Sequence, residues 1–127
     1  MRLSEAIRLG ALLKPQAFGL MTRDGGTCAW GAALEAAGIR FNCFGTLAPL
    51  PDDWKVLSAT LTTCPACGDE CHVGGIMGGH LNDIHRWTRE RIADWVATIE
   101  RAESPAAREA EALVSVEVVN DGNSILV

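Results

Sequence analysis

The chain has 127 residues, a formal net charge of −5 and an apolar content of 48%, values that suit one small domain or a domain with an appendage and exclude a globally disordered chain. No apolar run reaches the roughly 18 residues needed to span a membrane, and the charged N-terminus is unlike a signal peptide. No segment is strongly basic, which argues against nucleic acid as the default partner.

Two helices are predicted within residues 1–63, which we expect to form an N-terminal helical region. One covers residues 4–14, where apolar side chains share a rough face. The other covers residues 27–38, with Thr27 as its N-cap and Gly38 in the left-handed position after its last turn. The many alanine and glycine residues of this second helix indicate close packing against another helix.

The clearest helix covers residues 88–103, where apolar side chains recur at i, i+3, i+4 and i+7 and Thr88 is the expected N-cap. After it, residues 105–127 contain short apolar runs around an Asn-Asp-Gly-Asn sequence, which predicts a C-terminal β-hairpin. We therefore expect an α+β fold that is mostly helical and is divided into residues 1–63, residues 64–104 and residues 105–127.

The cysteines favour metal binding over disulfides. Their count is odd, two of them form a Cys-x2-Cys pair, and no export signal is apparent, so we expect a reducing compartment. A secreted protein with two disulfides and one free thiol is the alternative. The five cysteines are Cys28, Cys43, Cys64, Cys67 and Cys71.

Four residues have the spacing of a metal site, Cys-x2-Cys-x12-His-x4-His. A Cys-x2-Cys turn brings two thiolates to the same side, and two histidines at this spacing on a helix are expected to project from one face. Thiolate and imidazole ligands match the tetrahedral preference of zinc, and four protein ligands leave no open position for catalysis. We predict one structural Zn²⁺ ion bound by Cys64, Cys67, His80 and His85.

Two neighbouring residues make a second set of metal ligands possible. Cys71 or His72 can replace one of the four ligands, and Cys71 in place of a histidine gives a Cys3His site, although the histidine pair on the helix has the better spacing. Otherwise we expect Cys71 to be a small core residue and His72 to lie at the surface. Asp83, between the two histidines, can orient a ligand imidazole through a hydrogen bond.

Residues 64–85 resemble a single C2H2 zinc finger. The resemblance implies a ββα unit, with a hairpin across residues 64–73 and then a helix that carries both histidines. The sequence departs from the finger pattern at Cys71, where a large aromatic residue is usual.

By the same resemblance, the helix positions that read DNA bases in fingers hold Val73, Ile76 and Gly79. None of these side chains makes the hydrogen bonds that Arg, Asn or Gln make to base edges. We therefore expect no sequence-specific recognition of DNA.

A second resemblance covers more of the chain. The segment HLNDIHRWTRERIADW, together with SEAIRLGALLKPQ and CAWGAALEAAG, is similar to small uncharacterised proteins of bacteria and their phages. The similarity implies one unit with the finger in its second half, and it brings no activity. With no export signal, we expect a cytoplasmic protein, or a virion-associated one if a phage encodes it.

These features predict a non-enzymatic, zinc-stabilised module that binds another protein or copies of itself and does not contact a membrane. The C-terminal strands offer edges for such pairing. A structural or accessory protein of a phage or bacterial assembly would fit this description.

Two other functions stay open. A nucleic-acid-binding regulator would use Arg86, Arg89 and Arg91. A cysteine-dependent hydrolase would use Cys28, because a helix start can lower the pKa of a thiol. The competing interpretation of Cys28 is a small apolar residue on an alanine- and glycine-rich packing face.

Overall fold

The structure is a computed structural model that describes residues 1–103. Within that range, helices and three two-stranded antiparallel sheets confirm the mixed α+β class expected from the sequence, while the expected hairpin at 105–127 lies outside the described residues. The chain divides into two units, residues 1–97 and 98–127. The elements are α1 (Leu3–Ala11), β1 (Thr22–Arg23), β2 (Gly26–Thr27), α2 (Ala29–Ala36), β3 (Phe41–Asn42), β4 (Gly45–Thr46), α3 (Asp52–Ala59), β5 (Leu61–Thr63), β6 (Glu70–His72), α4 (Val73–Gly75), η1 (Ile76–Ile84) and α5 (Arg89–Glu103).

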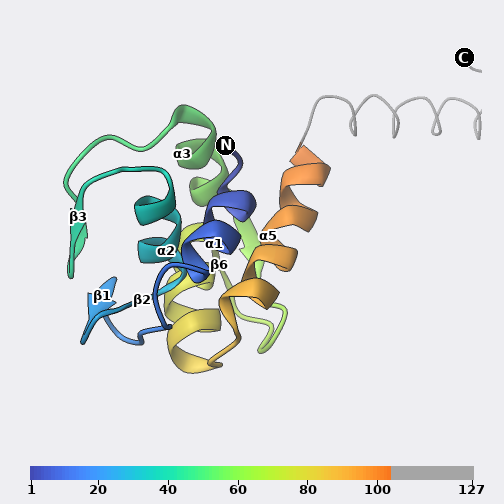
Figure 1. Ribbon diagram of the computed structural model, residues 1–127. Helices are drawn as coiled ribbons and strands as arrows, with labels where there is room; N and C mark the ends of the chain where they lie inside the picture. Colours follow the sequence, from blue (N-terminus) through green and yellow to red (C-terminus); the bar gives the residue numbers. More distant parts are fainter. Residues whose placement is uncertain (104–127) are drawn as a thin grey trace, which may run out of the picture. The chain divides into compact units, whose positions relative to one another are not determined.

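Helices α1 and α2 lie side by side (Figure 1). Their approach depends on Gly10 of α1, because a Cβ built there would collide with the backbone of Ala32 in α2. Leu3 and Ile7 on α1 and Leu34 on α2 are buried. The close helix packing predicted for the alanine- and glycine-rich segment is therefore confirmed.

Both ends of α2 have clear capping interactions. The N-cap is Cys28, whose sulfur accepts a backbone N–H at 3.4 Å, so the prediction of Thr27 as N-cap was wrong by one residue. At the other end Gly38 has a φ of +72°, and the Ile39 N–H donates to the carbonyl of Leu34 at 2.9 Å. This is the Schellman ending, and it confirms the left-handed glycine predicted from the sequence.

The β3–β4 hairpin turns through two residues and has an apolar tip. Asn42 pairs with Gly45, so Cys43 and Phe44 form the turn. The Asn42 side-chain oxygen accepts the N–H groups of Phe44 and Gly45 at 2.9 and 3.1 Å, which fixes the turn. Phe44 is 85% exposed, so this fixed turn presents a large apolar side chain to solvent.

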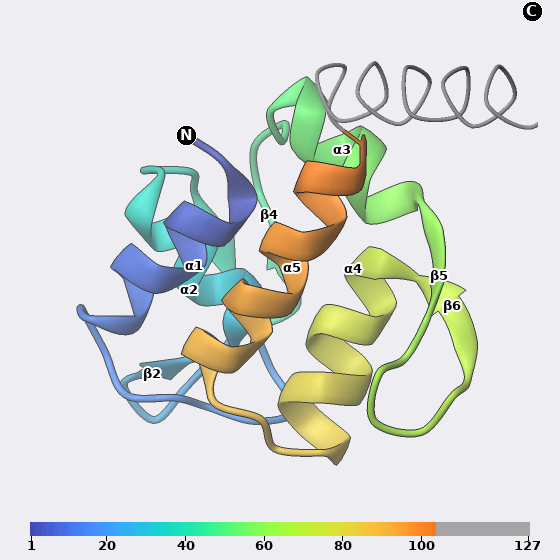
Figure 2. The same ribbon diagram turned by 90° about the vertical axis from the view of Figure 1, so that its right-hand side faces the viewer.

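Helices α4 and η1 run on as one helix directly after β6 (Figure 2). Helix α5 begins with Thr88 as its N-cap, as predicted, since its Oγ1 accepts the Arg91 N–H at 3.2 Å. In the part of the chain that the structure describes, no helix has the length and apolar composition needed to cross a membrane. The largest buried apolar side chains are Trp54, Leu3, Ile7, Leu34, Ile76, Met77, Leu81 and Ile92.

Asn82 of η1 is wholly buried and joins η1 to two earlier segments. Its Oδ1 accepts hydrogen bonds from the Gln16 side chain at 2.9 Å and from the Ala29 N–H at 3.2 Å. Its Nδ2 donates to the Ala17 carbonyl at 2.9 Å and to Asp83 Oδ1 at 2.8 Å. Two acceptor and two donor interactions are the full capacity of an amide. Asn82 therefore fixes where the start of α2 lies relative to η1.

Arg89, at the start of α5, is also buried, with an exposed fraction of 5%. Its guanidinium donates to Thr27 Oγ1 at 2.9 Å and to the Lys14 carbonyl at 2.7 Å. Longer bonds reach the carbonyls of Thr27 and Ala11 at 3.3 and 3.4 Å. Burial lowers the pKa of this guanidinium. The hydrogen bonds of this guanidinium hold the N-terminal segment against the start of α5.

Candidate metal centre

The loop between β5 and β6 carries the first two cysteines of the predicted site. The Cys64 N–H donates to the Asp69 carbonyl at 2.8 Å, and the Gly68 N–H donates to the Cys64 carbonyl at 2.9 Å. Gly68 has a φ of +83°, a backbone conformation that favours glycine. These bonds fold the loop tightly, so that buried Cys64 and exposed Cys67 present their sulfurs to the same space.

His80 lies in η1, which winds as a π-helix, and His85 is the C-cap residue directly after it. The His85 N–H donates to the His80 carbonyl at 2.8 Å, a bond between residues five apart. In an α-helix, residues five apart would point about 140° away from each other, since each residue turns the helix by about 100°. The expectation that the two histidines share a helix face is met only because the helix is wider here.

The four predicted ligands come together. One ligand atom from each of Cys64, Cys67, His80 and His85 lies within 4.8 Å of the others. Cys67 Sγ lies 3.6 Å from His80 Nδ1, and the two imidazole centroids are 6.2 Å apart. These residues are therefore close enough to hold a metal ion.

The chemistry of this cluster fits a metal. Two sulfurs and two imidazoles are the donor types that bind transition metals in tetrahedral sites. His85 Nε2 is buried, and among residues 1–103 the structure gives it no hydrogen-bond partner. A buried nitrogen without a partner carries a desolvation cost, which a metal bond would remove.

No family model, curated protein or solved structure matches this chain. The assignment of the metal centre therefore rests on the four ligands and their geometry. The ligands come from two neighbouring segments, the β5–β6 loop and the end of the π-helix, which the fold brings together.

The alternative ligands lie outside the cluster. Cys71 and His72 are in β6, where Cys71 is half-buried and His72 is exposed, and neither belongs to the group of four. Asp83 does not bond to either histidine in the structure. It accepts hydrogen bonds from the Gly19 N–H and the Asn82 side chain instead.

Cys28 lies at the start of α2, but this position does not lower the pKa of its thiol overall. Its side chain is buried, and burial raises the pKa of the Cys28 thiol above its ordinary value. The backbone N–H groups at the start of α2 act in the opposite direction but do not outweigh the burial. Desolvation of the thiolate is therefore the larger effect, which fits the interpretation of Cys28 as a small apolar residue on a packing face.

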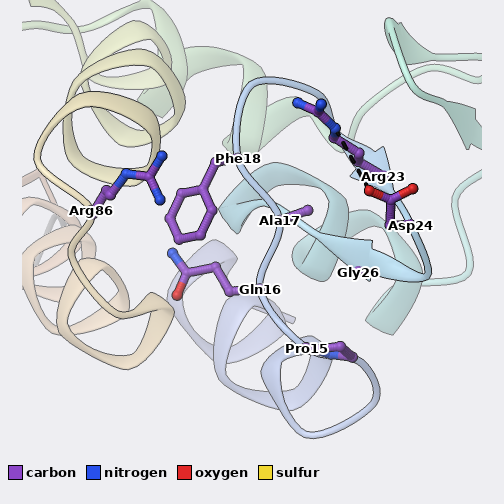
Figure 3. A pocket seen from close by; sticks show the side chains of 8 residues that line it. All are labelled: Pro15, Gln16, Ala17, Phe18, Arg23, Asp24, Gly26 and Arg86. Carbon is purple, nitrogen blue, oxygen red and sulfur yellow. Dashed lines mark ion pairs between the residues drawn. The ribbon is translucent and has the colours of Figure 1, made fainter.

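The three arginines after the site differ in availability. Arg89 is buried, as described above, whereas Arg86 lies over the Phe18 ring with its guanidinium carbon 4.3 Å from the ring centroid. Figure 3 shows this pair beside a pocket that Arg23 also lines. Arg91 lies over the Trp87 ring at 3.7 Å. Only Arg86 and Arg91 of the three are placed to meet an external anion.

The glycines of η1 have different environments, which sequence reasoning did not anticipate. A Cβ on Gly78 would lie 3.1 Å from the ring of Trp30, and Trp30 cannot shift easily because its indole N–H donates to the Gly74 carbonyl at 3.1 Å. A Cβ on Gly79 would meet no atom within 4 Å.

We expect Gly79→Ala to raise the free energy of unfolding by about 0.5–1 kcal/mol, since alanine loses less backbone entropy than glycine in a helix. We expect Gly78→Ala to lower it by about 1 kcal/mol, because overpacking against a fixed ring outweighs that gain. Urea unfolding of both metal-loaded variants measures the difference. Equal stabilities would show that Trp30 adapts to the added methyl group.

Proposed function

We propose that this chain is a non-enzymatic module whose fold is stabilised by one zinc ion and which binds another protein or a second copy of itself. The observation that carries the proposal is the cluster of two cysteines and two histidines with ligand atoms within 4.8 Å of one another. Zinc prefers this donor set, and four protein ligands complete its tetrahedral shell. No position is then left for a substrate or an activated water, which favours a structural role.

The order of elements supports a relation to the C2H2 finger. Strands β5 and β6 pair antiparallel, the cysteines lie in the loop between them, and the histidines follow on the next helix. The strands, at residues 61–63 and 70–72, begin earlier than the finger resemblance implies. Of the positions that read bases in fingers, Val73 and Ile76 are fully buried. Sequence-specific recognition of DNA by this helix is therefore disfavoured.

Exposed apolar side chains support a protein partner. Three leucines near the end of α1, Leu9, Leu12 and Leu13, are exposed by 49%, 82% and 57%. Phe44 at the β3–β4 turn is exposed by 85%. Single exposed apolar residues are common, but a group of them at one helix end is typical of surfaces that contact other proteins. This surface lies within residues 1–97, the same unit as the Cys/His cluster.

A nucleic-acid-binding regulator is the second candidate, favoured by one observation. Arg23 and Arg86 line one pocket of about 300 Å³, in which Arg23 also pairs with Asp24 at 3.8 Å (Figure 3). Two guanidiniums can contact phosphates, but one acid beside them and a net charge of −5 weaken that attraction. A hydrolase that uses Cys28 is disfavoured by the raised pKa of that thiol.

Native mass spectrometry of protein purified without added metal tests the proposal. We expect one zinc ion per chain, and strong chelation should remove both the ion and the helical circular dichroism signal. Sedimentation across a range of concentrations then tests self-association. A metal-free chain that keeps its fold would contradict the zinc assignment. A monomer whose binding to heterogeneous DNA weakens steeply with salt would favour the regulator instead.

A further inference from the structure

A second pocket lies between the turn of the β3–β4 hairpin and helix η1. Its volume is about 300 Å³, and none of the four Cys/His residues lines it. Its walls include Met21, Trp30, Phe44 and the backbone of η1 at Gly79. This volume and the mostly apolar, partly aromatic lining are typical of sites that bind small ligands or single side chains of a partner.

Two features indicate that this pocket can contact a partner molecule. The Trp30 ring is held in place by its hydrogen bond to the Gly74 carbonyl and by the absence of side chains at Gly74 and Gly78, against which it lies. The second feature is the turn at Cys43 and Phe44, which places an exposed aromatic ring where polar residues are usual. Because the turn already fixes the backbone at Phe44, only the freedom of its side chain is lost when a partner covers the ring.

The negative charge at the pocket favours a positively charged group in the molecule that binds there. Asp83 is the single charged side chain among the described residues that line it. Both hydrogen bonds that Asp83 accepts, from the Gly19 N–H and from Asn82 Nδ2, end on Oδ1. A carboxylate can accept about four hydrogen bonds, so Oδ2 keeps its capacity for a donor from outside. The faces of Trp30 and Phe44 also attract cations.

We propose that this pocket binds a segment of a partner protein in which an apolar side chain stands next to a lysine or arginine. The apolar side chain fills the space between Trp30 and Phe44, and the neighbouring cation pairs with Asp83. Gly79 leaves the η1 backbone open, so the partner's own backbone can approach it. The inference rests on the protein-binding function proposed above and names the kind of partner that the site takes.

The test uses the zinc-loaded full chain and three acetylated dipeptide amides, Phe-Lys, Phe-Gln and Phe-Glu, which share the apolar anchor and differ in charge. Two-dimensional NMR follows the Trp30 indole N–H and the amides of Gly78 and Gly79. We expect these signals to shift, with the Kd lowest for Phe-Lys and about two- to fivefold higher for Phe-Gln, as a partly exposed ion pair gives. Phe-Glu should bind weakest.

Three variants separate the anchor from the charge. Asp83→Asn keeps an oxygen acceptor and should make the Kd values of Phe-Lys and Phe-Gln equal. Gly79→Leu fills the pocket and should abolish the Trp30 shift with every peptide, and Gly79→Ala should weaken it partly. Phe44→Ala changes an exposed side chain, so it should raise the Kd of all three peptides without lowering the thermal midpoint.

The outcomes are distinct from those that test the zinc-stabilised module. Absence of a Trp30 shift with all peptides, or equal Kd values across the three charges, overturns the inference while zinc content and self-association are unaffected. A Trp30 shift produced by concentrating the protein alone assigns the pocket to a second copy of the chain and also overturns the inference. A chain without zinc contradicts the proposed function itself, whatever the pocket binds.

Discussion

Replacing Cys67 with Ser or His80 with Ala should remove the bound zinc and unfold the part of the chain that contains the Cys/His cluster. Structural zinc gives about 10–16 kcal/mol of apparent binding free energy in finger peptides, as much as or more than the whole net stability of about 5–15 kcal/mol of a small domain. Metal analysis and circular dichroism measure the result. The cluster depends on both residues, whose side chains lie 3.6 Å apart in the structure.

The matched control is Cys71→Ser. Cys71 lies in the same hairpin and is half-buried, but it does not belong to the cluster. We expect this variant to keep one zinc ion per chain and its cooperative unfolding. If His80→Ala kept full zinc and full stability while Cys71→Ser lost them, the alternative Cys3His ligand set would replace the one we assign.

Replacing Asn82 with Ala should have the second largest effect. The change removes four hydrogen bonds at a fully buried position and leaves the Ala29 N–H and the Ala17 carbonyl without partners. Each buried backbone group left in this way costs about 1–3 kcal/mol, so we expect a loss of about 3 kcal/mol or more in the free energy of unfolding. Urea unfolding with zinc bound measures the loss.

The control for this prediction is Asn42→Ala, the same substitution at an exposed site. Asn42 also makes two hydrogen bonds to backbone N–H groups, but water can replace them there. We expect its cost to stay below about 1 kcal/mol. Similar losses at the two positions would mean that the buried network around Asn82 contributes no more than an ordinary turn.

The sequence predicted the parts of this protein that depend on local chemistry. The Schellman ending of α2 and the N-cap at Thr88 follow from the intrinsic preferences of glycine and threonine. The four candidate ligands followed from spacing alone. Each of these features involves residues near one another in the chain, or a donor set with few alternative uses.

What the sequence did not predict depends on tertiary contacts. The π-helical winding of η1 has no clear local signal, because glycine pairs suggest only a weak helix. The burial of Arg89 and Asn82 could not be predicted from local pattern, since both side chains are polar and, apart from Asp83, the hydrogen-bond partners described for them lie 53 or more residues away. Polar residues are mostly exposed, so local pattern placed Arg89 at the surface.

Helix η1 contributes both to the Cys/His cluster and, through Asn82, to the packing of α2, so loss of the metal ion would affect more than the metal-binding loop. A zinc ion at the proposed site, bound to His80 and His85, would hold the same helix whose Asn82 amide fixes the start of α2. Binding of an ion to the folded state alone shifts the folding equilibrium by mass action, so the folded fraction follows the concentration of free ion. Zinc scarcity would then expose the chain to proteolysis well beyond the metal-binding loop, and cellular abundance would report zinc supply.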